Sequence, residues 1–565
     1  MTSLSADQLA EQARRYLSHP PHPRVAALAI PLFQRAVALA PARIDLRLDL
    51  ATAYFRLGQS AQAIETCDET LARYPDAVEA RLFRCMYQIR IVYHSAAEVT
   101  AAREAYGYQL AALTAMIDRE PARLERLAGW IHRARPFYLP YQGENDVELQ
   151  RTYGSLACRA MAAACPDWTG TRAMPPAPPG SPLRVGVVSG YFRNHAIWSA
   201  IIRGWLTGLD ASRFALHGYS LSARQDTCTA EARHRCARFH AGERSFRDWC
   251  ETISADRLHV LLYPEVCEHA LATRLAMLRL APVQGMAGGH CVTSGLPTMD
   301  YYLGGDLMEP ADAASHYSER LVRLPNLGYA YRQPLVAPPQ RIREDFGLRP
   351  EAVVYLSPHS VFKYLPQHDG VYADIAERVR DSQLVFVKHL KVEALSRQLE
   401  RRITAAFTAR GLDPKQHLVF LPRMGPSAYN DIQCLADIYL DAIGWNGGTT
   451  TATALGYGLP AVTLSGPVSR GRMGTAMLRR LGIFETIAGT PAGYVDIAAR
   501  LGHDKHFRRE LRQRVGAANH LLYDDPAYAG GLASFLEKAV AGSPGLSSSA
   551  SGSRCGGLPA QEGKR

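Results

Sequence analysis

The chain has 565 residues, of which 47% are apolar and 21% are charged. At about 100 to 200 residues per domain, this length predicts about three to four globular domains, and the apolar content excludes an intrinsically disordered chain. Lys and Arg exceed Asp and Glu by 11 without forming a long run of like charge. We therefore expect a mixed, mildly basic surface and no nucleic-acid partner.

Membrane and disulfide signals are both missing from the sequence. No apolar stretch reaches the roughly 18 residues needed to cross a membrane, and residues 1–15 lack the apolar core of a secretory signal. The eleven cysteines are scattered and form no CxxC pair, which indicates neither a zinc site nor a disulfide framework. We therefore expect a cytoplasmic protein with reduced thiols, no membrane partner and no bound metal.

Residues 1–165 are rich in Ala, Leu and Arg at helical spacing. Pro41, preceded by a small-apolar helix pattern, recurs 34 residues later as Pro75. This is the period of the tetratricopeptide repeat, in which small residues let two helices approach and proline follows the second helix. One repeat, at about 42–75, is clear, while 79–120 is either an expanded helix pair or a departure from the repeat. An ordinary helical bundle is the alternative.

The prolines of 166–182 (PDWTGTRAMPPAPPGSP) predict an extended, stiff linker. After it, short β-rich runs alternate with amphipathic helices, which predicts parallel sheets covered by helices. The charged stretch 339–350 divides this part into two Rossmann-like lobes, 183–338 and 339–542, with a cleft between them. The tail 543–565 is predicted to be disordered. The expected strands are 183–189, 259–263, 353–357, 384–388, 417–421, 438–443 and 461–465.

The loop after 438–443 reads GWNGGTTT and leads directly into an Ala-rich helix. Gly447 and Gly448 provide the turn, and Thr449 and Thr450 stand at the helix N-terminus. Such an end carries unpaired backbone N–H groups and positive partial charge, which suit a phosphate or diphosphate. A plain helix cap made by a threonine is the alternative. The pattern is not that of a P-loop, because GxxxxGK[ST] is absent.

The run 353–357 is followed by PHSVFK, which places Ser360 and Lys363 just beyond the end of a strand. Ligands of open α/β sheets bind at this end of the strands. The lysine could neutralise a leaving diphosphate as a point charge, whereas an isolated loop lysine is usually only solvated. Its significance depends on facing the same cleft as the two threonines.

Two further segments stand in the first predicted lobe. The run 183–189 leads to GYFRNH, so that His195 is a candidate acid or base, a hydrogen-bond partner of the substrate, or simply a helix cap. The segment 288–295 (GGHCVTSG) contains His290 and Thr293, with glycines for close backbone approach and hydroxyls that could bond a sugar. A flexible turn is the alternative for this segment.

The sequence resembles the O-GlcNAc transferases, especially their bacterial homologues. The resemblance lies in the order of its segments, which are a tetratricopeptide array followed by LRVGVVSGYFRNH, APVQGMAGGHCVTSG, VVYLSPHSVFK and GWNGGTTT. The resemblance runs from Leu46 to about Tyr528. It implies a GT-B fold behind the helical array and an inverting, metal-independent enzyme without a cofactor. Such an enzyme transfers N-acetylglucosamine from UDP-GlcNAc to Ser or Thr hydroxyls of polypeptides.

The resemblance also assigns roles to particular residues. Lys363 is similar to the family lysine that stabilises the departing UDP phosphates, and Thr449 and Thr450 to the family's phosphate-binding threonines. His195 resembles the family histidine near donor and acceptor, as a general base or as a binding residue. Thr293 lies in what looks like the family's segment beside the sugar.

Several positions depart from the family pattern. Gly448 stands where eukaryotic members usually have His, Thr453 where they have Asp, and Phe362 where they have Tyr. Tyr429 replaces a histidine that stacks on uracil and keeps an aromatic face. Arg472 matches the arginine after the family's last core strand.

These departures lie around the nucleoside rather than the phosphates, so two alternatives stay open. One is a UDP-sugar-binding tetratricopeptide scaffold with weak or no catalysis. The other is a UDP-glucose-dependent transferase with another acceptor.

Overall fold

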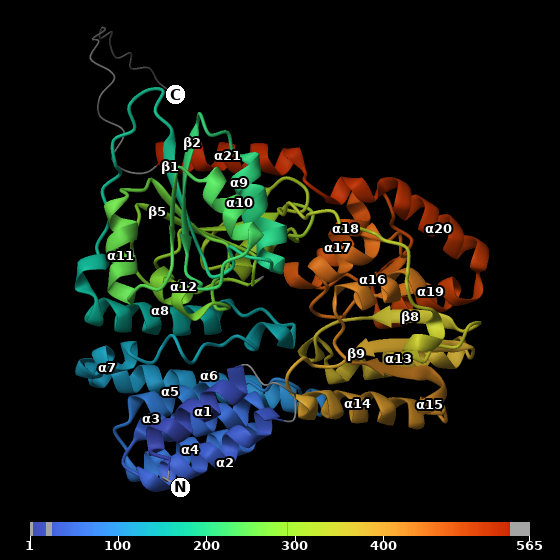
Figure 1. Cartoon of the computed structure of the whole chain (residues 1–565), viewed down its shortest axis with the longest axis horizontal. Coiled ribbons are helices and arrows are strands. Elements are labelled where there is room, and N and C mark those ends of the chain that lie inside the picture. Colours follow the sequence, from blue (N-terminus) through green and yellow to red (C-terminus); the bar gives the residue numbers. More distant parts are fainter. Residues whose placement is uncertain (1–3, 19–24, 291, 543–565) are drawn as a thin grey trace, which may run out of the picture.

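The structure is a computed structural model that describes residues 4–18, 25–290 and 292–542. The tail 543–565, for which disorder is predicted, lies outside the described residues. Figure 1 shows three bodies: a helical array, a first α/β lobe above it, and a second lobe whose helix α14 (Glu393–Thr408) lies beside the array. None of the described helices combines the length and the apolar character that crossing a membrane requires.

Helices alone build the N-terminal array. Helices α3 and α4 form the pair predicted for 42–75, and the fully buried Ala53 and Ala63 let them pack closely. The segment 79–120 is an expanded pair, because the 24-residue α6 follows the short α5 through a loop that buries Ile91. The described helices of the array are α1 (Ala6–Ser18), α2 (Ala29–Leu39), α3 (Ile44–Arg56), α4 (Ser60–Arg73), α5 (Val78–Met86), α6 (Ala96–Arg119), α7 (Leu124–Ala128) and α8 (Val147–Ala164).

The first lobe is built on a parallel sheet of order β3-β2-β1-β4-β5-β6-β7. Its strands are β1 (Leu183–Ser189), β2 (Phe214–Ser220), β3 (Arg238–Ala241), β4 (Val260–Tyr263), β5 (Val283–Ala287), β6 (Tyr301–Gly305) and β7 (Arg320–Leu324). Its helices are α9 (Arg203–Gly208), α10 (Thr227–Arg235), α11 (Phe246–Ala255) and α12 (Ala270–Ala276). The linker 166–182 packs along this lobe, where it buries Trp168.

The second lobe is built on a parallel sheet of order β10-β9-β8-β11-β12-β13. Its strands are β8 (Val353–Ser357), β9 (Ser382–Val387), β10 (Leu418–Leu421), β11 (Ile438–Leu440), β12 (Ala461–Leu464) and β13 (Ile487–Ala488). Besides α14, the helices in this part of the chain are α13 (Asp369–Arg378), α15 (Pro414–His417), α16 (Pro426–Leu435), α17 (Thr449–Gly456), α18 (Met473–Arg480), α19 (Pro491–His503), α20 (Lys505–Ala518) and α21 (Pro526–Ala541). Each of the predicted strand runs overlaps a strand, and the expected pair of Rossmann-like lobes is confirmed.

The last helix, α21, packs on the first lobe against α9 and β7 (Figure 1). The Trp205 indole N–H donates a hydrogen bond to the Tyr528 hydroxyl, and the rings of Tyr301 and Phe535 lie 5.1 Å apart. Residues 339–542, predicted as the second lobe, therefore contribute to both lobes.

A buried ion-pair network docks the helical array onto the second lobe. The Asp146 side chain is fully buried, and its carboxylate accepts from Arg103 Nη1 at 2.7 Å and from Arg470 Nη2 at 2.9 Å. Arg470 also donates from Nε to the Pro140 carbonyl oxygen at 2.7 Å. Breaking a buried pair by removing one partner typically costs about 3–5 kcal/mol. This network therefore fixes the segment around Pro140 against the second lobe.

The array also touches the first lobe, backbone against backbone. A Cβ atom on Gly154, in α8, would lie 2.1 Å from the Gly295 carbonyl oxygen. Only glycine permits this approach, because no flexible side chain is present that could move away.

We predict that Gly154→Ala forces α8 away from the first lobe and lowers the unfolding temperature, since such overpacking costs about 1–3 kcal/mol. Gly107→Ala is the matched control, because its Cβ would meet only the flexible Leu149 Cδ2 at 3.4 Å. Inside helix α6 this change gains helix propensity. Differential scanning calorimetry of the two variants measures the difference, and equal unfolding temperatures would contradict the prediction.

Candidate active site

A cavity of about 340 Å³ lies where the helical array and both lobes meet. The array contributes Phe137 and Tyr141 to its wall. Its lining contains six of the site residues predicted from the sequence, and these are His195, His290, Lys363, Gly448, Thr449 and Thr450. The strand ends of two separate sheets thus converge on one space, as the topology of open α/β lobes requires.

The glycine-rich loop between β11 and α17, which was predicted to suit a phosphate, is held by a buried carboxylate. Asp441 is fully buried, and its Oδ1 accepts hydrogen bonds from the backbone N–H groups of Gly447 at 2.7 Å and Ala442 at 3.0 Å. The Thr463 hydroxyl donates to Oδ2 at 3.0 Å. Burial raises the pKa of Asp441 to about 6, while these donors and Lys363 lower it. The loop is therefore held in one conformation from beneath.

The N-terminus of α17 faces the cavity with Thr449 and Thr450, while Thr451 turns inward to Asp441 at 3.2 Å. Gly448 is the residue before the helix, and no side chain caps the helix there. The plain-cap alternative therefore fails, because none of the three threonines caps this end. The end instead presents backbone N–H groups to a cavity that Thr449 and Thr450 line, with the Thr450 hydroxyl hydrogen-bonded to that of Tyr439.

Lys363 ends a 3₁₀ turn, Val361–Lys363, that follows β8. Its ammonium group donates to the Asn446 carbonyl oxygen at 2.8 Å and lies 5.7 Å from the centre of the Trp445 ring. The lysine is thus tied to the same loop that carries the threonines. A positive charge and a helix N-terminus share one wall of the cavity.

His195 stands on the opposite lobe. Its ring stacks on Tyr191 with centroids 3.9 Å apart, and Nδ1 accepts from the Ile197 N–H at 3.3 Å. The histidine therefore caps the following helix and lines the cavity at the same time. Burial, with help from Arg193, lowers the pKa of His195 to about 4, so the ring is neutral at pH 7.

His290 forms part of an apolar wall. Its ring stacks on Phe137 with centroids 4.9 Å apart and lies 5.3 Å from Trp445. Burial lowers the pKa of His290 to about 3, which keeps the ring uncharged. Its role in the structure is to join the array to the second lobe across the cavity.

Aromatic residues of the helical array belong to the site, although sequence reasoning missed them. Tyr141 stacks on Trp445 with ring centroids 4.0 Å apart, and it meets Phe362 edge to face with ring centroids 4.6 Å apart. Phe362, the neighbour of Lys363, therefore packs against the helical array. The run RPFYLPYQ (135–142), rich in aromatics and proline within a helical region, was the signal that could have found them.

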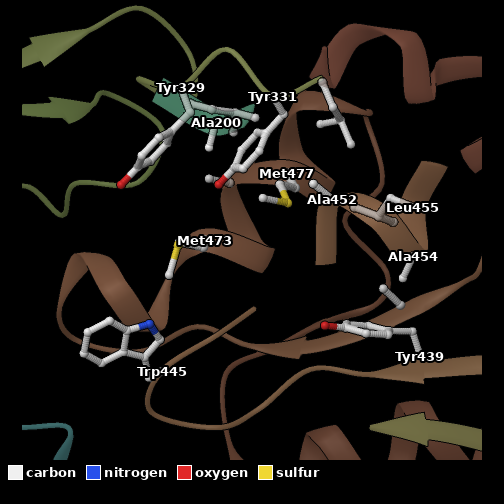
Figure 2. Close-up of a cluster of buried hydrophobic side chains, with 14 of the residues drawn as sticks. Ala200, Tyr329, Tyr331, Tyr439, Trp445, Ala452, Ala454, Leu455, Met473 and Met477 are labelled. Carbon is white, nitrogen blue, oxygen red and sulfur yellow. The ribbon is translucent and has the colours of Figure 1, made fainter. Parts of the chain in front are cut away.

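Figure 2 shows a cluster of buried side chains where the two lobes meet. Tyr329 and Tyr331, from the end of the first lobe, lie opposite Met473 of the second lobe, with Trp445 below. The Tyr329 hydroxyl donates to the Gly288 carbonyl oxygen at 3.0 Å. These side chains close the cavity with apolar and aromatic surface, as in most small-molecule sites.

Several predicted site residues lie outside the lining of this cavity. Thr293 donates its hydroxyl to the buried carboxylate of Glu319 at 2.6 Å. Arg472 bridges the lobes, because Nε donates to the Met308 carbonyl oxygen at 3.1 Å. The others are Ser360, which is exposed, Tyr429, which is half-buried on α16, and Gly447, which acts through its backbone.

We predict that Gly447→Ala weakens UDP binding at least tenfold, because the new Cβ would lie 2.2 Å from Thr450 Oγ1 and 2.5 Å from Thr451 Oγ1. The helix N-terminus would then be displaced from the cavity. Gly489→Ala is the control, since nothing lies within 4 Å of its Cβ position. Isothermal titration with UDP checks this, and unchanged affinity in both variants would refute the role of the turn.

Two parallel-sheet lobes that share a cavity, with a helix N-terminus and a lysine turned into it, are the arrangement of the two-lobed GT-B glycosyltransferases. The model of glycosyl transferase family 41 matches residues 168–330 and 336–530, and the chain belongs to this family. A tetratricopeptide repeat model matches residues 26–84, which confirms the character of the helical array.

Individual relatives agree with this assignment. One relative is the Arabidopsis thaliana protein described as probable UDP-N-acetylglucosamine–peptide N-acetylglucosaminyltransferase SPINDLY. The chain is 26% identical to it over 373 residues, and this alignment covers 63% of this chain and 39% of the relative. The chain is also 26% identical over 340 residues to the same plant's SEC, described in the same words, covering 57% of this chain and 31% of the relative. The chain thus spans less than half the length of these curated relatives.

A solved structure supports the fold over most of the chain. A lysine-to-methionine mutant of the Thermobaculum terrenum O-GlcNAc transferase superposes with a TM-score of 0.68 at 21% identity, covering 96% of this chain and 99% of that one. The predicted order of helical array and GT-B lobes is thereby confirmed.

Proposed function

We propose that the protein is an inverting, metal-independent glycosyltransferase that moves N-acetylglucosamine from UDP-GlcNAc to Ser or Thr hydroxyls of polypeptides. The observation that carries this proposal is the shared cavity, in which Lys363 and the N-terminus of α17 supply positive charge. Membership of family 41 supports sugar transfer. The names of the plant relatives support UDP-GlcNAc as donor and a peptide as acceptor.

The reaction needs stabilisation of the leaving group. In our proposal the acceptor hydroxyl attacks the anomeric carbon from the face opposite to UDP, and the bond between that carbon and the β-phosphate oxygen breaks. Lys363 and the N–H groups at Thr449 and Thr450 then meet the negative charge that develops on the phosphate. Because the Asn446 carbonyl and the buried Asp441 hold these groups in place, little reorganisation is needed during the reaction.

A metal ion has no assigned task in this proposal. Divalent cations commonly neutralise a departing diphosphate, and here Lys363 and the helix end would do so. No cofactor is needed either, because UDP-GlcNAc already carries an activated sugar.

The helical array supports a polypeptide acceptor. Phe137 and Tyr141 of the array line the same cavity as Lys363, so an acceptor approaching from that side would contact the array before it reaches the donor. No nucleic acid or membrane enters the proposal. We place the reaction in the cytoplasm, in keeping with the free thiols of the nine described cysteines.

We predict that Lys363→Ala lowers turnover about 10²- to 10³-fold, the usual loss when one preorganised charge-stabilising donor is removed. UDP release from UDP-GlcNAc, with water or a Ser/Thr peptide library as acceptor, measures the rate. Lys415→Ala is the control, because this lysine is exposed on α15. A rate for Lys363→Ala close to that of the wild type would remove the lysine from the mechanism.

We further predict that an excess of EDTA leaves the rate unchanged and that UDP-GlcNAc is turned over faster than UDP-glucose. Metal independence follows from the charge supplied by Lys363 and α17. Parallel assays with and without added Mg²⁺ or Mn²⁺, and with each donor, give both answers. A rate that collapses in EDTA and returns with metal would overturn the first part, and faster turnover of UDP-glucose the second.

A further inference from the structure

A second cavity, of about 260 Å³, adjoins the first, and Phe137 and Glu268 line both. Its walls come mainly from the helical array, with Phe55 and Tyr87 among them and Arg133 at its edge. An acceptor that reaches the donor from the side of the array would therefore pass Glu268. The carboxylate of Glu268 stands at the junction between the acceptor side and the donor side.

We propose that Glu268 is the catalytic base of the transfer reaction and accepts the proton of the acceptor hydroxyl where the two cavities meet. This inference rests on the proposed function, because it assigns a residue to the same reaction. The acceptor oxygen forms its bond to the anomeric carbon, and the bond to the phosphate oxygen breaks with its electron pair leaving on UDP. The acceptor proton passes to the Glu268 carboxylate, which later releases it to water.

The surroundings of Glu268 suit a proton acceptor. Its side chain is 24% exposed, and the Tyr191 hydroxyl hydrogen-bonds to its carboxylate. His195 Nε2 lies 4.0 Å from Oε1. Arg135 and Arg193 are the cations that favour its ionised form, and Arg135 bonds to the backbone oxygen rather than to the carboxylate. The carboxylate is thus positioned without being locked into an ion pair.

The geometry of His195 argues against the histidine as the base. Because Nδ1 accepts the Ile197 N–H, the proton of the neutral ring resides on Nε2. Nε2 is then a donor and has no lone pair to receive a proton in the cavity. At 4.0 Å from Oε1, Nε2 lies beyond hydrogen-bond distance of the carboxylate, so His195 is a neutral neighbour of Glu268 rather than the base.

The protonation of Glu268 sets the expected pH dependence. Burial raises the pKa of Glu268 to about 7, and the Tyr191 hydrogen bond and the two arginines limit the rise. The half-buried His195 and His269 have pKa values lowered to about 4 by partial burial, so both remain neutral across this range. Since a base must be deprotonated, kcat should increase with pH through about 7 and level off above it.

The test compares wild type, Glu268→Gln, Glu268→Asp and the control Glu251→Gln, whose side chain is 57% exposed on α11. The probe is UDP-GlcNAc, with water or a Ser/Thr peptide library as acceptor. We expect Glu268→Gln to lower kcat about 10²- to 10⁴-fold, the usual contribution of a general base. Its affinity for UDP and its unfolding temperature should stay those of the wild type. Glu268→Asp should retain part of the rate, with a shifted pH profile.

The outcomes separate this inference from the proposed function. A wild-type enzyme that turns over while Glu268→Gln keeps a similar rate overturns the inference and leaves the proposed function standing. A wild type that binds UDP without releasing it from UDP-GlcNAc overturns both. If Glu268→Gln fails to fold, the pH profile of the wild-type kcat decides. A kcat that stays constant from about one pH unit below to one pH unit above the Glu268 pKa of about 7 also refutes Glu268 as the base.

Discussion

The buried carboxylate of Asp146 is the interaction on which the rest of the site depends. It pairs with Arg103 of the helical array and with Arg470 of the second lobe. Arg470 also donates a hydrogen bond to the Pro140 carbonyl oxygen. The aromatic segment 137–141 is thereby held between the lobes, where it completes the wall of the cavity. The array is therefore part of the wall of the candidate site rather than a separate appendage.

Charge in the chamber is arranged by burial. Asp441 lies beneath the turn and fixes the backbone donors of α17, so that the second lobe presents positive charge to the cavity. On the facing lobe, burial keeps His195 and His290 neutral and moves Glu268 close to its point of half-protonation at neutral pH. One wall thus stabilises an anion while the other is suited to exchanging a proton.

Sequence reasoning found local features better than spatial ones. The predicted runs correspond to β1, β4 and β8 to β12, whereas β2, β3, β5, β6, β7 and β13 were not predicted. Among these, β3 (RFHA) and β7 (RLVRL) carry arginines, which hide the apolar pattern of a strand. Lys363, Thr449 and Thr450 could be predicted because each follows the end of a predicted strand within one short stretch of sequence. Glu268 and Phe137 were missed because their importance comes from contacts between segments far apart in the chain. Thr293 was predicted to bond a sugar through its hydroxyl, but that hydroxyl donates a hydrogen bond to the Glu319 carboxylate.

The return of α21 to the first lobe means that two covalent crossings, the segment 332–342 and the turn before α21, join the lobes. Two crossings restrict the relative movement of the lobes more than one would, and the helical array, which packs on both lobes, restricts it further. The turn is tied to the first lobe by Asn326, whose amide donates to Asp525 at 2.7 Å. Any opening of the cavity would therefore be greatest on the side away from these crossings.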